Sequence, residues 1–137
     1  MGSVININGA GKERNQLTRG IVLALRELVA QKDTDSYTQD LAAFIVLALE
    51  SISKTIDSSV EAWEKRGYWV KADRFRMEWA WSSRLAQMMR KALMEEDWSQ
   101  VALAVAQVAE KLKTVKVPQR HHLGSPWVGA WEQLHKS

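Results

Sequence analysis

Between Gly11 and Lys113 the chain contains almost no residue that would interrupt a helix. Both prolines lie after residue 117, and the only glycines within this stretch are Gly20 and Gly67. Since glycine and proline oppose helix most strongly, a stretch this long with so few of them favours helices joined by short turns. Beyond the short segment SVININ, residues 3–8, no alternation typical of a strand is visible. The sequence therefore predicts an all-α protein.

Apolar residues recur every three or four positions in four segments, as one face of an amphipathic helix requires. The first, second and fourth segments cover approximately residues 13–32, 37–66 and 98–112. The third begins somewhere between Trp69 and Asp73 and runs to about Glu95. Because the connections between them are short, they predict an antiparallel, up-down four-helix bundle with a short fifth helix at the C-terminal end. Residues 1–12 are expected to form a flexible arm, residues 13–113 the bundle, and residues 114–137 a basic, tryptophan-bearing tail.

Capping signals mark several of the expected helix ends. Ser36 with Gln39 fits a capping box at the start of the second helix, and Asp97 fits the cap of the fourth. Ser125 followed by Pro126 predicts the start of the short C-terminal helix, because proline is favoured at the first helical position.

The second and third segments could instead form one helix, running from residue 37 to residue 96. At 1.5 Å per residue such a helix would be about 90 Å long, which is more than a single small domain could cover. Gly67 offers an end, since glycine readily takes the left-handed conformation that closes a helix. The sequence therefore predicts that the chain reverses direction at Gly67 and packs two long helices against each other. Residues 41–49, which are apolar on nearly all sides, place the second helix at the centre.

The composition excludes several classes of protein and site. The chain has no cysteine, which rules out disulfides, thiolate zinc sites and a cysteine nucleophile. The longest apolar run, residues 41–49, is far shorter than the roughly 20 residues that a membrane-spanning helix needs. Because the N-terminus also lacks the charged and apolar regions of a secretory signal, we expect a cytoplasmic protein that does not associate with membranes.

The net charge is only +3, but the charges are unevenly distributed. Residues 33–66 carry seven acidic and three basic side chains, whereas residues 111–137 carry five basic and one acidic. Residues 1–32 are also basic, with five basic and two acidic side chains. The two basic ends could bind a polyanion, or they could pair with the acidic helix between them.

Residues 63–81 combine four of the seven tryptophans with eight charged side chains, which admits two interpretations. In the structural interpretation, four rings lie in or near the core, while the interleaved charges face water or pair locally. These are the rings of Trp63, Tyr68, Phe75 and Trp79. In the functional interpretation, the remaining rings of this stretch and its cations form a binding surface.

The functional interpretation places Trp69 and Trp81 off the main apolar stripe, where they stay partly exposed. Together with Lys71, Arg74 and Arg76 they would form an aromatic and basic platform. Tryptophan and arginine dominate the energetics of protein interfaces, and aromatic rings beside cations also bind unpaired bases. The platform therefore suits a protein partner, including a second copy of the chain, or single-stranded nucleic acid.

The C-terminal tail carries the remaining candidate residues. Trp127 and Trp131 lie four positions apart, and rings this large are expected to dock either on their own bundle or on a second copy. A basic, histidine-containing segment precedes them, with Lys116, Arg120, His121 and His122. Adjacent histidines in one loop cannot easily share a metal, and no nearby carboxylate would orient either as a catalytic base. We therefore interpret them as solvated loop residues.

Taken together, these features predict a non-enzymatic binding or assembly module that forms a homodimer or binds another protein, with no cofactor and no metal. Its working surface is expected to combine the turn at residues 66–81 with the tail at residues 116–131. The alternative is a nucleic-acid-binding accessory protein, whose binding would weaken steeply with salt. A third hypothesis is an enzyme, which requires Asp73, His121 and His122 to converge in a concave pocket.

Overall fold

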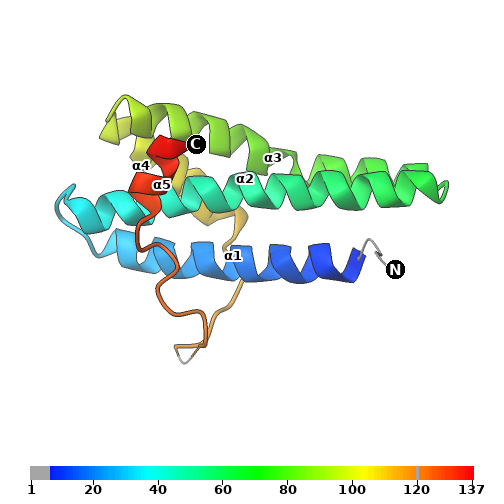
Figure 1. Ribbon diagram of the computed structural model, residues 1–137, viewed down its shortest axis with the longest axis horizontal. Helices are drawn as coiled ribbons and strands as arrows, with labels where there is room; N and C mark the ends of the chain where they lie inside the picture. The colour runs from blue at the N-terminus through cyan, green and yellow to red at the C-terminus, as the bar shows by residue number, and fades with distance from the viewer. Residues whose placement is uncertain (1–6, 120) are drawn as a thin grey trace.

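The computed structural model describes residues 7–119 and 121–137. In this part of the chain all regular secondary structure is helical, which confirms the prediction of an all-α protein. The helices are α1 (Ile7–Val29), α2 (Ser36–Lys65), α3 (Trp69–Met94), α4 (Trp98–Lys111) and α5 (Ala130–Lys136) (Figure 1). None of these helices carries an apolar stretch long enough to cross a lipid bilayer.

The central helix is α2, which packs against α1, α3 and α5 (Figure 1). Its residues 41–49 are apolar on nearly all sides, and most of them are buried, as the sequence predicts. Leu41, Ile45, Leu49 and Ile52 are completely inaccessible to solvent. Burial of each such side chain stabilises the fold by about 1.5–3 kcal/mol, so α2 contributes a large part of the core.

The chain reverses direction between α2 and α3 through the predicted glycine turn. Gly67 takes the left-handed conformation, with φ of 79°. Its amide donates to the carbonyl oxygen of Glu64 at 3.0 Å, and the amide of Tyr68 donates to that of Trp63 at 2.9 Å. These two hydrogen bonds define a Schellman motif. They end α2 and allow α3 to begin at Trp69, so the predicted reversal is confirmed.

The starts of three helices, α1, α2 and α5, differ from the sequence prediction. α1 begins at Ile7, so the second half of the expected flexible arm is helical, while residues 1–6 lie outside the described part of the chain. Arg14 donates to the hydroxyl of Thr55 at 3.1 Å, which holds the early turns of α1 against α2. The cap of α2 is Asp35 rather than Ser36, because the Asp35 carboxylate accepts from the Thr38 amide at 3.0 Å.

The cap of α4 is as predicted, since the Asp97 carboxylate accepts from the backbone amide of Gln100 at 3.2 Å. The C-terminal helix does not begin at Ser125 and Pro126. Instead, residues 126–129 form a turn, and α5 begins at Ala130. Gly129, the residue before α5, takes the left-handed conformation with φ of 80° and separates the turn from the helix.

The last helix of the main group, α4, packs against α3 but has few contacts with α1 (Figure 1). The segment that follows α4 crosses α1, and the chain later returns to α2 as α5 (Figure 1). As a consequence, the surface between α1 and α4 is not closed by helix-to-helix packing.

Candidate binding surfaces: an aromatic tip and an apolar groove

Large apolar side chains are exposed where α2 turns into α3. Tyr68, Trp69 and Val70 are 53%, 61% and 66% exposed, so Tyr68 does not belong to the core as the structural interpretation expected. We call these three residues, with Lys71 and Arg74 beside them, the tip surface. Contiguous exposed apolar residues of this size commonly mark a binding site. The prediction that Trp69 is exposed is confirmed.

Two of the three cations predicted for the basic platform, Arg76 and Lys71, are engaged within the protein. Arg76 forms ion pairs with Glu64 at 2.9 Å and with Asp73 at 2.6 Å. The hydrogen bonds within these two ion pairs raise the pKa of Arg76, and the one with Glu64 has the larger effect. The Lys71 ammonium lies 4.7 Å from the centre of the Trp63 ring. The predicted basic platform is therefore partly neutralised by its own neighbours.

Trp81 does not contribute to an exposed platform, and this prediction is wrong. Its side chain is only 8% exposed, and its ring stacks on Trp79 with the ring centres 5.7 Å apart. α3 packs against both α2 and α4, so a wider arc of its surface is covered than a single apolar stripe predicts. Trp81 belongs to the core.

Three other rings of the same stretch form a partly buried cluster, in agreement with the structural interpretation. Trp63 packs edge-to-face against Phe75 with ring centres 4.8 Å apart, and Phe75 lies 6.4 Å from Trp79. The guanidinium of Arg14, on α1, covers this cluster at 4.8 Å from the Phe75 ring. Burial lowers the pKa of Arg14, and the carboxylate of Glu78 opposes that effect. This contact from α1 could not be read from the spacing of the rings.

The C-terminal tail docks on its own chain. Trp127 is 5% exposed and packs edge-to-face against Tyr37, with ring centres 6.4 Å apart. Trp131 is partly buried against the same core. The Asp40 carboxylate accepts hydrogen bonds from the backbone amides of Gly129 at 3.2 Å and Trp131 at 2.9 Å. Asp40 thus caps α5 from a different helix, and neither tryptophan is available as an exposed binding residue.

The tip surface and the tail lie toward opposite ends of α2 (Figure 1). The tail contacts residues 37 and 40 at the start of α2, whereas the tip surface follows its last residue. A helix of 30 residues is about 45 Å long. The predicted working surface, which combined residues 66–81 with residues 116–131, is therefore not formed, because the two segments do not meet.

The histidines of the tail do not converge with the acidic group expected for a catalytic site. The ring nitrogen Nδ1 of His121 accepts from the Leu123 amide at 3.3 Å, and His122 is exposed. Asp73 lies on α3 near the tip surface and pairs with Arg76. Within residues 7–119 and 121–137, no group of three or more acidic or histidine side chains is placed to hold a metal ion. Arg120 lies outside the described residues.

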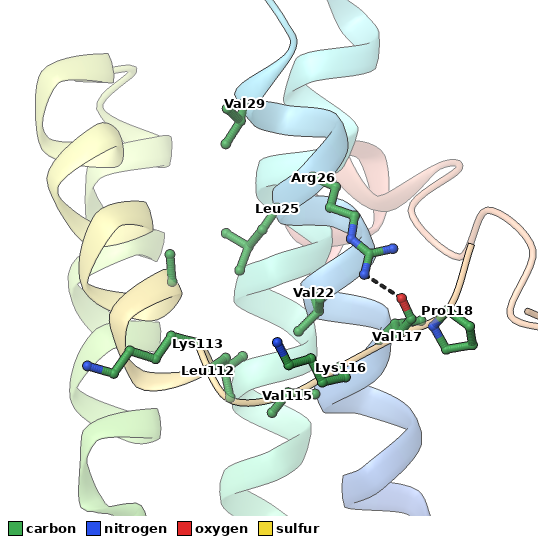
Figure 2. Close-up of a pocket in the computed structure, with 11 residues that line it drawn as sticks. Val22, Leu25, Arg26, Val29, Leu112, Lys113, Val115, Lys116, Val117 and Pro118 are labelled. Carbon is green, nitrogen blue, oxygen red and sulfur yellow. Dashed lines mark hydrogen bonds between the residues drawn. The ribbon is translucent and has the colours of Figure 1, made fainter. Parts of the chain in front are cut away.

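A surface groove runs between α1 and α4, where the sequence offered no specific motif. Its first part has a volume of about 610 Å³ and lies between the C-terminal half of α1 and the end of α4 (Figure 2). It is lined by Val22, Leu25, Arg26, Val29, Ala109, Leu112, Lys113, Val115, Lys116, Val117 and Pro118. Most of these side chains are apolar, and the charged ones are all basic.

A second hollow, of about 360 Å³, continues toward the start of α4. It shares Leu25, Val29 and Ala109 with the first part, so the two are continuous. Its further lining residues are Leu28, Thr38, Trp98, Val101, Ala102, Val105 and Ala106. We call the continuous feature the α1–α4 groove. The sequence signal for it was weak: small alanines in α4, which allow a neighbouring helix to approach closely.

Cations gather at the end of the groove nearest the end of α4. The Arg26 guanidinium donates to the carbonyl oxygen of Val117, which fixes the extended segment across this end (Figure 2). The ammonium of Lys116, a predicted binding residue, points into the groove, whereas Lys113 points away from it. Lys113 is paired with Glu110 at 2.7 Å, and this contact raises the pKa of Lys113 and lowers that of Glu110.

Comparison of the chain with protein-family models, with curated proteins and with solved structures finds no significant match. The two surfaces themselves are therefore the basis for assigning a function. The tip surface also has two hollows, of about 560 Å³ each, but charged side chains contribute to both of them: Lys71 to both, and Arg74 and Glu78 to one. In the α1–α4 groove the inner part is lined by apolar side chains and Thr38, and the charged side chains lie at one end.

Proposed function

We propose that this protein is a non-enzymatic binding and assembly module that receives a helix of a polypeptide partner in the α1–α4 groove. The observation that carries the proposal is a continuous apolar groove with an exposed wall, in which Val29 is 80% exposed. An amphipathic helix binds to such a groove by burying its apolar side between the two walls.

The arrangement of the helices supports this proposal. We infer an antiparallel, up-down order for α1 to α4, since successive helices pack against each other along the chain. In a closed bundle of this order, the fourth helix would pack along the first. Here α4 has few contacts with α1, so one position between two helices is left open to another helix.

The dimensions of the groove also suit a helix. α4 has 14 residues and is therefore about 21 Å long, which corresponds to about four helical turns. Its side chains toward the groove include the exposed Ala102, Ala106 and Ala109. Small side chains allow the axes of packed helices to approach at the short end of the usual 8–10 Å range. An incoming helix would bury these residues together with Val29.

Site-specific photocrosslinking tests the proposal. A photoreactive phenylalanine analogue is placed at Ala106, in the groove, and in a matched control at Gln87, which is exposed on α3. We expect the probe at Ala106 to form a crosslink to one defined helical segment, whose peptide is then identified by mass spectrometry. The substitution Val29→Glu should abolish it. If Ala106 gives no more crosslinking than Gln87, both with the purified protein and in cells, the proposal is wrong.

The tip surface supports a second candidate, a nucleic-acid-binding accessory function. The specific observation is the exposure of Tyr68 and Trp69 next to Arg66 and Arg74, which have no ion pair within the described residues. Exposed rings beside cations bind unpaired bases by stacking. This function predicts that a labelled single-stranded oligonucleotide binds at about 50 mM salt, more weakly at higher salt and more weakly to Trp69→Ala. Absence of binding at low salt would exclude it.

A further inference from the structure

We infer that the helix received by the α1–α4 groove is α4 of a second copy of this chain, lying antiparallel across a two-fold axis. This inference rests on the proposed function and identifies its partner. A two-fold symmetric interface uses the same patch on both copies, so that patch must be complementary to itself. The charges and the shape of α4 both meet this requirement.

The two ends of α4 carry opposite charges. The turn before it presents Glu95, Glu96 and Asp97, which are all exposed. The residues at and after its other end include Lys111 and Lys116, which are also exposed. In an antiparallel pair, each acidic turn lies next to the basic end of the other copy, and symmetry makes this contact twice. A parallel pair would place like charges together.

At the basic end, neighbouring charges leave this pattern intact. Glu110 is the acidic residue in the last turn of α4, and it is paired with Lys113. Arg26 and Lys116, which line the groove at this end, therefore add to Lys111 in a local excess of positive charge. At such an interface, complementary charges select the orientation of the partner and favour association, whereas like charges oppose it.

The side chains along α4 are complementary in size as well. Trp98, Ala102, Val105 and Ala109 follow one another at intervals of three or four residues and line the groove. A two-fold axis between Ala102 and Val105 brings Trp98 of each copy next to Ala109 of the other, so that the largest side chain faces a small one. Leu103, which is 54% exposed and is not one of the groove residues, then lies near the level of the axis along α4.

The tip surface, another exposed apolar feature of the described residues, fits the groove less well. The tip surface includes Lys71 and Arg74 and lies next to Arg66, and the groove ends at Arg26 and Lys116. Docking of the tip of one copy into this end of another would bring cations together. Such a head-to-tail contact would also not close into a dimer. The antiparallel α4 pair avoids both problems.

Sedimentation equilibrium with charge-reversed variants tests this inference. The acidic turn is reversed in the double variant E95K/E96K, and the basic end is reversed in K111E/K116E. We expect the wild-type protein to have twice the chain mass of 15.6 kDa. Each variant alone should dissociate, with a dissociation constant at least about tenfold higher, because both of its ends then carry the same sign. A mixture of the two variants should form a heterodimer, and the four substitutions in one chain should restore the homodimer.

All four positions are exposed, so helical content and melting temperature should stay close to those of the wild type. If a variant does not fold, Ala106→Glu provides a second route, because it introduces a charge into the apolar contact at an exposed position. A wild-type protein that is monomeric at all concentrations would overturn the inference, as would a dimer whose mass is unchanged by every one of these substitutions. A monomer that still crosslinks through Ala106 to a different protein would overturn the choice of partner alone and leave the proposed function in place.

Discussion

Removal of the Asp40 carboxylate is expected to loosen the C-terminal tail. Both carboxylate oxygens of Asp40, on α2, accept hydrogen bonds from backbone amides at the start of α5. These amides have no partner within their own helix, because the first turn of any helix leaves its N–H groups free. In the variant Asp40→Ala they lose their acceptor, and the negative charge near the positive end of the α5 dipole is also lost.

The size of the effect follows from these contacts. Loss of a capping side chain costs about 0.5–2 kcal/mol, and hydrogen bonds to a charged group lie at the upper end of the usual range. Since Asp40 is partly exposed, water replaces part of the loss, and we expect about 1–2 kcal/mol. For a domain of this size that change lowers the melting temperature by roughly 3–8 °C.

The assay combines thermal unfolding with hydrogen–deuterium exchange of the peptide that covers residues 127–137. We expect faster exchange in this peptide for Asp40→Ala, together with the lower melting temperature. The matched control is Asp57→Ala, which removes an exposed carboxylate from the same helix and should change neither quantity. An unchanged exchange rate in Asp40→Ala, or an equal loss of stability in Asp57→Ala, would refute the role of Asp40 as the cap of α5.

Three further predictions concern the fold. Gly67→Ala should lower the free energy of unfolding, measured in urea, by about 1–2 kcal/mol, because φ of Gly67 is +79° and a residue with a Cβ is strained there. Since an added Cβ would meet no atom within 4 Å, a steric clash would not explain the loss, and an unchanged stability would show that the left-handed backbone carries no such strain. Leu134→Ala should cost about 2–5 kcal/mol, since this side chain is completely buried between α5 and the core, and a loss below 1 kcal/mol would show that the tail is not docked. Hydrogen bonds from Thr38, of which the one from its backbone amide has the largest effect, lower the pKa of Asp35 in the folded protein. The ionised Asp35 carboxylate therefore stabilises the fold above its unfolded pKa, and this stabilisation is lost as the pH falls through its folded pKa. The melting temperature of Asp35→Ala should therefore fall less between pH 7 and pH 2 than that of the wild type, and parallel curves would exclude this contribution.

The features that the sequence predicts correctly are those encoded locally. The reversal at Gly67 depends on a residue that takes positive φ without a steric cost, and the cap of α4 depends on Asp97 and a nearby amide. The central place of α2 follows from a segment that is apolar on all sides, because no solvent-exposed helix can have that composition. Each of these signals lies within a few residues of the structure that it determines.

The features that were missed depend on contacts between distant parts of the chain. Trp81 is buried because α3 contacts two helices, and the width of its covered arc is set by α4. Asp40 and Trp131 are 91 residues apart in the sequence, so no local pattern links them. The groove arises because α4 packs on α3 and hardly contacts α1, a matter of helix placement that amphipathic spacing does not specify.

The central claim, that the groove receives α4 of a second copy, is tested most directly by a distance measurement across the dimer. Because the chain has no cysteine, Leu103→Cys and Tyr68→Cys each carry a single spin label. Helices packed in contact have axes about 8–10 Å apart, so we predict a short intermolecular distance between labels at Leu103, within about 30 Å, and a longer one at Tyr68. An absent intermolecular signal at Leu103, or a shorter distance at Tyr68 than at Leu103, would contradict the claim.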